Sequence, residues 1–138
     1  MIQTAGAGTP SGDGLIGRMV CVDYGDCHAL DVLCDETVLR AVMDRLCEEI
    51  GIRVVSNASK SFGPGAGITA VNVLATSSLS VHTWPELGAA CIDLFSCATD
   101  FEDDFVDRFF AEAFRAASSA RTCFDRVRPV PLTAPVSA

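Results

Sequence analysis

Ser77-Ser78-Leu79-Ser80-Val81-His82-Thr83-Trp84-Pro85-Glu86 is the stretch from which most of the fold and chemistry of this chain can be predicted. Leu79 and Val81 alternate with Ser80 and His82, and such alternation is typical of a strand with one buried face. The stretch also contains one of the two histidines, the only tryptophan and a carboxylate. We therefore expect a strand whose polar face carries reactive side chains.

Apolar segments on both sides of this strand predict the remaining elements. Helical spacing of apolar residues predicts helices at 36–50 and 101–117, the first capped by Asp35 and ended by Gly51. The order β-α-β-β-β-β-α-β favours an α+β fold, a two-layer sandwich of a mostly antiparallel sheet with helices packed on one face. Besides the quoted stretch, strands are predicted at 19–24, 52–56, 68–75, 89–97 and 122–128.

Length and composition predict a single domain. The chain has 138 residues, of which 49% are hydrophobic and 20% charged, which is typical of a globular protein with a proper core. Residues 1–14 are rich in Gly, Ser, Thr and Pro and predict a flexible leader, and residues 131–138 predict an irregular tail. One folded domain is expected between them, from residue 15 to residue 130.

The charge of the chain narrows the classes of partner. The formal net charge is -8 and the pI is about 4.5. An acidic surface repels phosphate backbones, so we expect no nucleic-acid partner. No apolar run approaches the roughly 20 residues of a membrane span, and the N-terminus lacks the pattern of a signal peptide. We therefore expect a cytoplasmic protein without membrane contact.

The seven cysteines do not predict a metal site. Their number is odd, and no two of them form a CxxC pair, whereas a zinc site is typically built from closely spaced pairs. In a reducing compartment they are expected to be small core residues, with the exception of Cys97.

The segment from Thr69 to Cys97 resembles the prokaryotic S-adenosylmethionine decarboxylase proenzymes, and this resemblance implies that four of its side chains take part in a cleavage of the backbone. Ser77 follows an apolar strand, and a tight turn there would strain the backbone for attack of its hydroxyl on the carbonyl of Thr76. His82 is the natural base for the α-proton of Ser77, because an imidazole exchanges protons near neutral pH. Cys97 is a candidate proton donor, and the hydroxyl of Thr69 can hydrogen-bond the intermediate.

Two further residues have the chemistry to bind a substrate. The indole of Trp84 can stack on an aromatic ring and attract a cation such as a sulfonium. The carboxylate of Glu86 can accept hydrogen bonds from a ribose or pair with a cation.

The most specific part of this resemblance is the motif His-Thr-Trp-Pro-Glu with a cysteine fifteen residues after its histidine, a pattern similar to that of the prokaryotic S-adenosylmethionine decarboxylase proenzymes. The resemblance implies a homodimeric decarboxylase of S-adenosylmethionine that supplies aminopropyl groups for spermidine synthesis. It implies cleavage between residues 76 and 77, which converts Ser77 into a pyruvoyl cofactor that forms a Schiff base with the substrate. The other implied roles are processing for His82, proton donation for Cys97, support of processing for Thr69, and substrate binding for Phe62, Leu79, Trp84 and Glu86.

Two residues depart from the pattern of that family. Thr76 stands where the family usually has glutamate before the cleavage serine, and Ser78 stands where it usually has histidine. The β-branched side chain of Thr76 crowds the carbonyl that has to be attacked. The three adjacent hydroxyl residues also leave the cleavage point open by one residue.

These departures leave two alternative functions. The first is a sister pyruvoyl decarboxylase that acts on arginine, ornithine or another amino acid. The second is an uncleaved paralogue that binds a ligand or partner and catalyses no reaction. Activity on free amino acids would distinguish the first alternative, and an intact chain would distinguish the second.

Overall fold

The structure of the protein is a computed structural model that describes residues 14–97 and 101–132. Nearly all of the predicted leader and residues 133–138 of the predicted tail lie outside the described residues. Residues 128–132, which precede them, follow the last strand without regular secondary structure.

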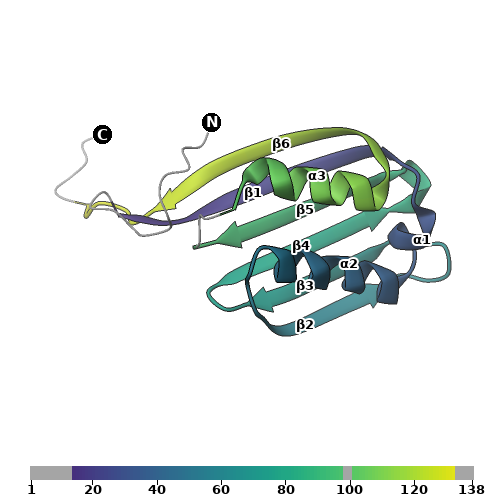
Figure 1. Cartoon of the computed structure of the whole chain (residues 1–138), viewed down its shortest axis with the longest axis horizontal. Coiled ribbons are helices and arrows are strands. Elements are labelled where there is room, and N and C mark those ends of the chain that lie inside the picture. Colours follow the sequence, from purple (N-terminus) through teal and green to yellow (C-terminus); the bar gives the residue numbers. More distant parts are fainter. Residues whose placement is uncertain (1–13, 98–100, 133–138) are drawn as a thin grey trace.

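Six strands of the described chain form one sheet in the order β2-β3-β4-β5-β1-β6 (Figure 1). All neighbouring strands are antiparallel, and the β2-β3-β4-β5 part is a meander of sequential hairpins. The strands are β1 (Leu15–Cys27), β2 (Val54–Ser61), β3 (Ile68–Leu74), β4 (Ser77–Trp84), β5 (Ala89–Ser96) and β6 (Ala116–Val127).

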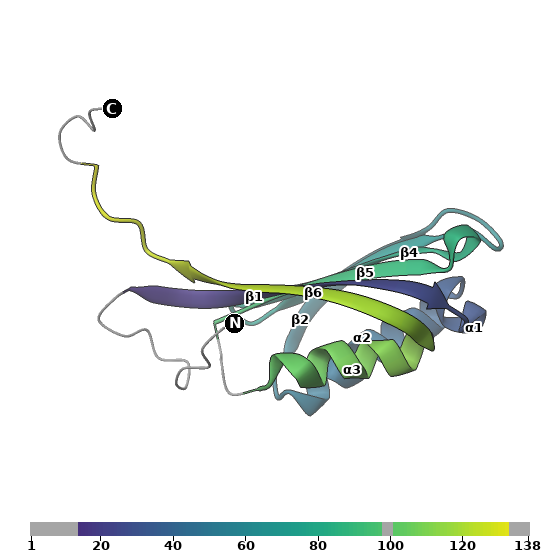
Figure 2. The same ribbon diagram turned by 90° about the horizontal axis from the view of Figure 1, so that it is seen from above.

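The helices lie on one side of this sheet, as Figure 2 shows. They are the short α1 (Leu30–Leu33), the longer α2 (Glu36–Glu49) and α3 (Asp103–Phe114), and a single 3-10 turn, η1 (Pro85–Leu87), follows β4. Within the described residues no helix covers the other side of the sheet, which we call the open face. The predicted α+β sandwich, with helices on one face of an antiparallel sheet, is confirmed.

The core lies between the sheet and the two longer helices. Leu79 and Val81 of β4 are fully buried, and Phe110 and Phe114 of α3 are buried against the same layer. Burying one such side chain contributes roughly 1.5–3 kcal/mol, so this layer supplies most of the free energy that holds the sheet and helices together. The alternation predicted from Leu79, Ser80, Val81 and His82 is confirmed, because Ser80 and His82 are only half-buried.

The helix α2 begins and ends where local sequence predicts. The carboxylate of Asp35 accepts hydrogen bonds from the backbone of Thr37 and Val38 at 2.9 and 3.1 Å, which satisfies two donors of the first turn. After the helix, Gly51 has a φ of 76°, which only glycine adopts without strain.

The C-terminal boundaries differ from the prediction. The helix expected at 101–117 ends at Phe114, because Arg115 takes a left-handed conformation with φ 50°. The strand expected at 122–128 begins already at Ala116, where it pairs with Cys27 of β1. The small residues at 116–120 favour a helix by composition, but backbone hydrogen bonds to β1 override that preference.

The strand expected at 52–56 also has different ends. β2 begins at Val54 and continues to Ser61, through the polar residues 57–61, for which no strand is predicted from the sequence. Two side-chain hydrogen bonds attach this segment to α2, from Arg40 to Asn57 and from Ser59 to Glu36. Tertiary contacts therefore extend an edge strand that the sequence alone does not indicate.

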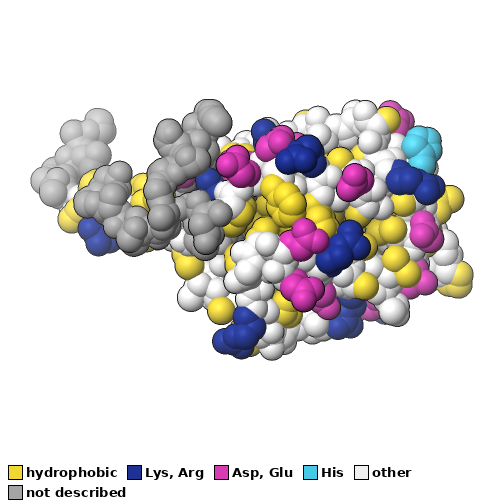
Figure 3. All heavy atoms as spheres, viewed as in Figure 1, with side chains coloured by type: hydrophobic (Ala, Val, Ile, Leu, Met, Phe, Trp, Pro, Cys, Tyr) yellow, Lys and Arg dark blue, Asp and Glu magenta, His cyan; other side chains and the backbone are white. Residues whose placement is uncertain are grey.

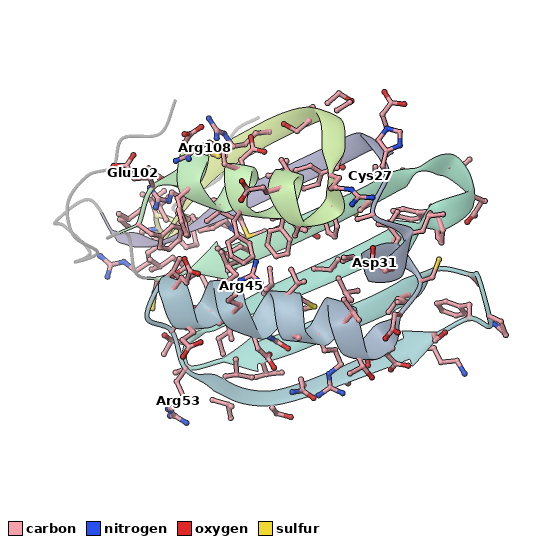
Figure 4. All side chains as sticks on the ribbon, turned by 45° about the vertical axis from the view of Figure 1, so that its right-hand side comes forward. Cys27, Asp31, Arg45, Arg53, Glu102 and Arg108 are labelled. Atoms are coloured by element: carbon pink, nitrogen blue, oxygen red, sulfur yellow. The ribbon has the colours of Figure 1, made fainter. Side chains whose placement is uncertain are left out.

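A groove runs between α2 and α3 on the outer side of the helices. Figure 3 shows hydrophobic side chains gathered there among acidic and basic ones. Arg45 extends from α2 toward α3 (Figure 4), and its guanidinium lies 4.8 Å from the ring centre of Phe109.

No helix of the described residues is long and apolar enough to cross a membrane.

Arg18 is a charged residue inside the core. It is 1% exposed, and its guanidinium lies 3.3 Å from the carboxylate of Asp103 at the start of α3. It also donates to the carbonyl of Phe101 at 3.1 Å and stacks on the ring of that residue. Arg18 therefore fastens the start of α3 to β1. The same Asp103 carboxylate lies near Cys123 of β6, and burial of Cys123, reinforced by this carboxylate, raises the pKa of its thiol to about 11.

Replacing Arg18 by methionine leaves the Asp103 carboxylate buried without its partner. We expect the free energy of unfolding to fall by about 3–5 kcal/mol, measured by urea denaturation. Arg108→Met is the matched control, because Arg108 pairs with Asp104 on the surface and both side chains are mostly exposed. Equal stability of the two variants would contradict a structural role for the buried pair.

Candidate functional site

A cavity of about 430 Å³ opens at the end of β4. The loop between β2 and β3 forms one wall of it, and the last residues of β4 form the other. The lining includes five residues singled out from the sequence: Phe62, Thr69, His82, Trp84 and Glu86.

Thr69 and His82 form the polar pair of this cavity. They lie opposite each other on β3 and β4, and the Thr69 hydroxyl is 3.1 Å from Nδ1 of His82. A hydrogen bond to one ring nitrogen fixes the orientation of the imidazole and leaves Nε2 to act on a ligand or proton. On the other side of His82 lies Cys91 of β5, and burial together with Asp93 raises the pKa of its thiol.

Two aromatic side chains and one carboxylate complete the cavity. The indole of Trp84 is stacked with the ring of His82, with centres 6.2 Å apart. Trp84 and Phe62 are 40% and 63% exposed, which is high for large apolar side chains. Glu86, in η1, is also exposed. Such a set can bind a flat aromatic group and a positive charge.

Close backbone packing holds the loop 62–67 against β4. A Cβ on Gly67 would lie 2.1 Å from the carbonyl oxygen of Thr83, so only glycine allows this approach. The buried hydroxyl of Thr83 accepts from the backbone of Ile68 at 2.9 Å and donates to the carbonyl of Leu33 at 2.8 Å. The cavity walls are thus joined through Thr83, which sequence reasoning did not single out.

A second group of reactive side chains lies at the opposite end of β4. Leu74 and Ser77 pair across the β3–β4 hairpin, and Ala75 and Thr76 form its tip. The hydroxyl of Thr76 lies 2.9 Å from the thiol sulfur of Cys97, just after β5. Cys97 continues the alternation of Cys91, Asp93 and Phe95, which places it on the open face. Ser77 and Cys97 therefore lie at the same end of the sheet, and Thr76 is the residue whose side chain contacts Cys97.

Thr76 has an unfavourable backbone conformation. Its φ is 60°, and of the non-glycine residues with positive φ in the described ranges it alone is β-branched. The left-handed conformation costs roughly 1–2 kcal/mol for an ordinary residue, and glycine or asparagine is preferred at such a hairpin position. The peptide bond between Thr76 and Ser77 thus follows directly on a strained residue.

The structure does not bring Ser77 and His82 of one chain together. His82 lies five residues further along β4, which corresponds to about 16 Å at the rise of a strand. The two positions also differ by five, an odd number, so their side chains lie on opposite faces of the strand. The expected base and the expected nucleophile are therefore at different ends of the sheet.

Leu79, expected in the substrate pocket, lies elsewhere. Its side chain is fully buried in the core between β4 and the helices, on the face opposite to His82. It does not line the cavity, because its position on β4 points it to the helical side. The sequence carried this signal, since Leu79 alternates with Ser80 and His82.

Comparison with known proteins identifies similar sequences. A family model described as S-adenosylmethionine decarboxylase matches residues 18–127. An S-adenosylmethionine decarboxylase proenzyme of Pyrobaculum aerophilum is 38% identical over 93 residues, which cover 66% of this chain and 72% of that protein. One of Prochlorococcus marinus is 30% identical over 123 residues, which cover 88% and 96%.

A solved structure has a similar fold. The adenosylmethionine decarboxylase from Aquifex aeolicus matches with a TM-score of 0.75 at 19% identity, over 87% of this chain and 98% of that one. At this identity the likeness concerns the arrangement of helices and strands.

Replacing Gly67 by alanine tests the packing of the cavity wall. The added Cβ forces the loop 62–67 away from Thr83. Trp84 is the only tryptophan of the chain and lines the same cavity, so we expect its emission to shift to longer wavelength and acrylamide to quench it more strongly. Ala66→Ser is the control in the same loop. A spectrum of Gly67→Ala equal to that of the control would contradict the proposed contact.

Proposed function

This chain belongs to the S-adenosylmethionine decarboxylase family, and on that basis we propose that it is a self-cleaving decarboxylase of S-adenosylmethionine. The observation that carries the proposal is the placement of Ser77 directly after the strained Thr76, with the thiol of Cys97 at the same end of the sheet. Cleavage would occur between Thr76 and Ser77.

The residues around Ser77 fit a pyruvoyl group made from this serine. Ser77 is at the start of a strand, beside a hairpin tip, so scission there leaves both strands paired to their other neighbours. The group would supply a carbonyl that withdraws electrons from a substrate amine while carbon dioxide leaves. Cys97 lies at this end of the sheet, and its thiol would return a proton to the substrate carbon.

The cleavage itself uses groups of the chain. The Ser77 hydroxyl attacks the carbonyl carbon of Thr76, and the bond from that carbon to the Ser77 nitrogen breaks, which gives an ester and a free amine. A base then removes the α-proton of Ser77, and the Thr76 carboxylate leaves. Water converts the resulting unsaturated residue into the pyruvoyl group with release of ammonia. His82 is the candidate base.

Because His82 cannot reach Ser77 within one chain, we propose that a second copy supplies it. Two sheets whose open faces meet across a twofold axis near the middle of β4 would place Thr69 and His82 of one copy against the Thr76–Ser77 backbone and Cys97 of the other. Such an isologous contact generates two identical sites in a dimer. Each site would then combine the nucleophile and thiol of one chain with the base of its partner.

The open face has the surface for such a contact. Phe124 and Val73 lie in the same row across the sheet as Met19 and Phe95, and they are 44% and 47% exposed. Phe95, Met19 and Phe124 are direct neighbours in this row, and Ser78 lies between Phe95 and Val73. Exposed apolar side chains that gather in this way favour burial against another protein surface. A second copy would cover them and close the site from water.

The cavity at the other end of β4 would bind the adenosine part of the substrate. Phe62 and Trp84 offer ring faces for an adenine and for the sulfonium, and Glu86 offers a carboxylate to ribose hydroxyls or to positive charge. Thr69 would support processing by orienting His82.

The two alternative functions differ from the proposed one in the substrate that loses carbon dioxide and in whether the purified chain is cleaved. A sister decarboxylase would release carbon dioxide from arginine or ornithine without an adenosine group, whereas the exposed aromatic pair favours S-adenosylmethionine. Carboxyl-labelled S-adenosylmethionine, arginine and ornithine can be compared in one assay. A non-catalytic paralogue would release nothing from any of them and would stay intact.

We expect the purified chain to consist of two fragments, 1–76 and 77–138, with a blocked N-terminus on the second. Intact mass spectrometry measures both fragments and distinguishes cleavage after Thr76 from cleavage after Ala75. Ser77→Ala is the control and should keep the full mass, because it lacks the attacking hydroxyl. A wild-type chain that remains full-length over days would contradict the decarboxylase proposal.

Mixing two inactive chains tests the shared site. Ser77→Ala and His82→Ala chains, each with its own tag, are expected to remain uncleaved when produced separately. When they are produced together, one site of the mixed dimer combines Ser77 of one chain with His82 of the other. We therefore expect the His82→Ala chain to be cleaved only in the mixture. Mixed dimers without cleavage, shown by pull-down of both tags, would refute the shared site.

A further inference from the structure

We propose that Thr76 is a positioning residue that holds the thiol of Cys97 as long as the chain is intact, and that cleavage after Thr76 frees this thiol. The release step rests on the proposed cleavage, whereas the contact in the intact chain does not. The residue before the cleavage point would thus control the availability of the proton donor.

The hydrogen bonds at Thr76 determine which group gives its proton. The Thr76 hydroxyl donates to the carbonyl oxygen of Ala75 at 2.5 Å and lies 2.9 Å from the sulfur of Cys97. A hydroxyl has one proton and two lone pairs, and that proton is used on Ala75. The thiol of Cys97 is therefore the donor to the Thr76 oxygen, so its proton points away from any substrate.

The hairpin keeps Thr76 in this position. Leu74 pairs with Ser77, and the backbone N–H of Ala75 donates to the carbonyl of Arg53 at 3.2 Å, so both sides of the tip are fixed. Thr76 adopts the left-handed conformation at the second position of this tip, and the pairing of Leu74 with Ser77 holds it there. The strain in Thr76 is thus maintained by the continuity of the chain.

Scission of the bond between Thr76 and Ser77 removes that constraint. Thr76 becomes the end of its fragment, and a β-branched residue without a closing bond leaves the left-handed region. Its hydroxyl then moves away from Cys97, and the thiol proton becomes available to a bound substrate. The same event that exposes the new N-terminus of the second fragment therefore releases the proton donor.

Alkylation of Cys97 in an uncleavable chain tests the contact. Ser77→Ala is treated with iodoacetamide under native conditions, and the modification of each cysteine is followed by peptide mass spectrometry. The sulfur of Cys97 has to leave its contact with the Thr76 hydroxyl before it can attack the reagent, so this contact slows alkylation. In Ser77→Ala/Thr76→Val we expect Cys97 to react roughly three- to tenfold faster, as for the loss of one hydrogen bond. Valine keeps the shape of threonine but has no hydroxyl.

Ser77→Ala/Thr76→Ser is the matched control, because serine keeps the hydroxyl and lacks only the methyl group. We expect its Cys97 to react at the rate of the Ser77→Ala chain, and Cys91, on the same face, to react equally in all three. Melting curves verify that the three chains are folded alike. Equal Cys97 rates in the valine and serine variants would overturn the contact.

The wild-type chain tests the release. Its Cys97, once the chain is cleaved, should react as fast as that of the valine variant. Cleaved wild-type protein with the slow rate of Ser77→Ala would overturn the release while the proposed function stands. Absence of cleavage would overturn the proposed function and the release together, and the contact in the intact chain would still be decided by the three variants.

Discussion

Burial of only one face of the sheet is the constraint on which the rest of the structure depends. Leu79 and Val81 have to face the helices, so their neighbours Ser80 and His82 have to face away from them. A shift of one residue in the pairing of β4 would exchange the two faces and put His82 into the core. Burial of the apolar residues on one face of each strand therefore determines where the polar side chains of the other face lie.

Much of the fold could be predicted because its signals are local. Asp35 caps the start of α2, and Gly51 with its left-handed conformation follows the end of that helix. The alternation of apolar and polar residues predicts β4. The misplaced boundaries at residues 57–61 and 116–121 have a common cause. Both segments are polar or small, and they become strands only through pairing and side-chain contacts with residues far away in the sequence.

The candidate site could be predicted by residue type but not by arrangement. The chemistry of Ser77 and His82 requires that they act together, but their spacing on β4 places them far apart within one chain. The sequence of a single chain therefore does not show how they meet. The contact between Thr76 and Cys97 depends on the left-handed tip of the β3–β4 hairpin. Threonine is an improbable residue there, so no propensity argument would have placed its hydroxyl against the thiol.

The separation of Ser77 and His82 at the two ends of β4 has a kinetic consequence. If the base comes from another copy, maturation is a bimolecular event, and a newly made chain cannot mature before it meets a second one. At low abundance most chains would persist as precursors, and the mature fraction would rise more steeply than the amount of protein. The geometry of one strand would thus couple the activity of each molecule to how many copies surround it.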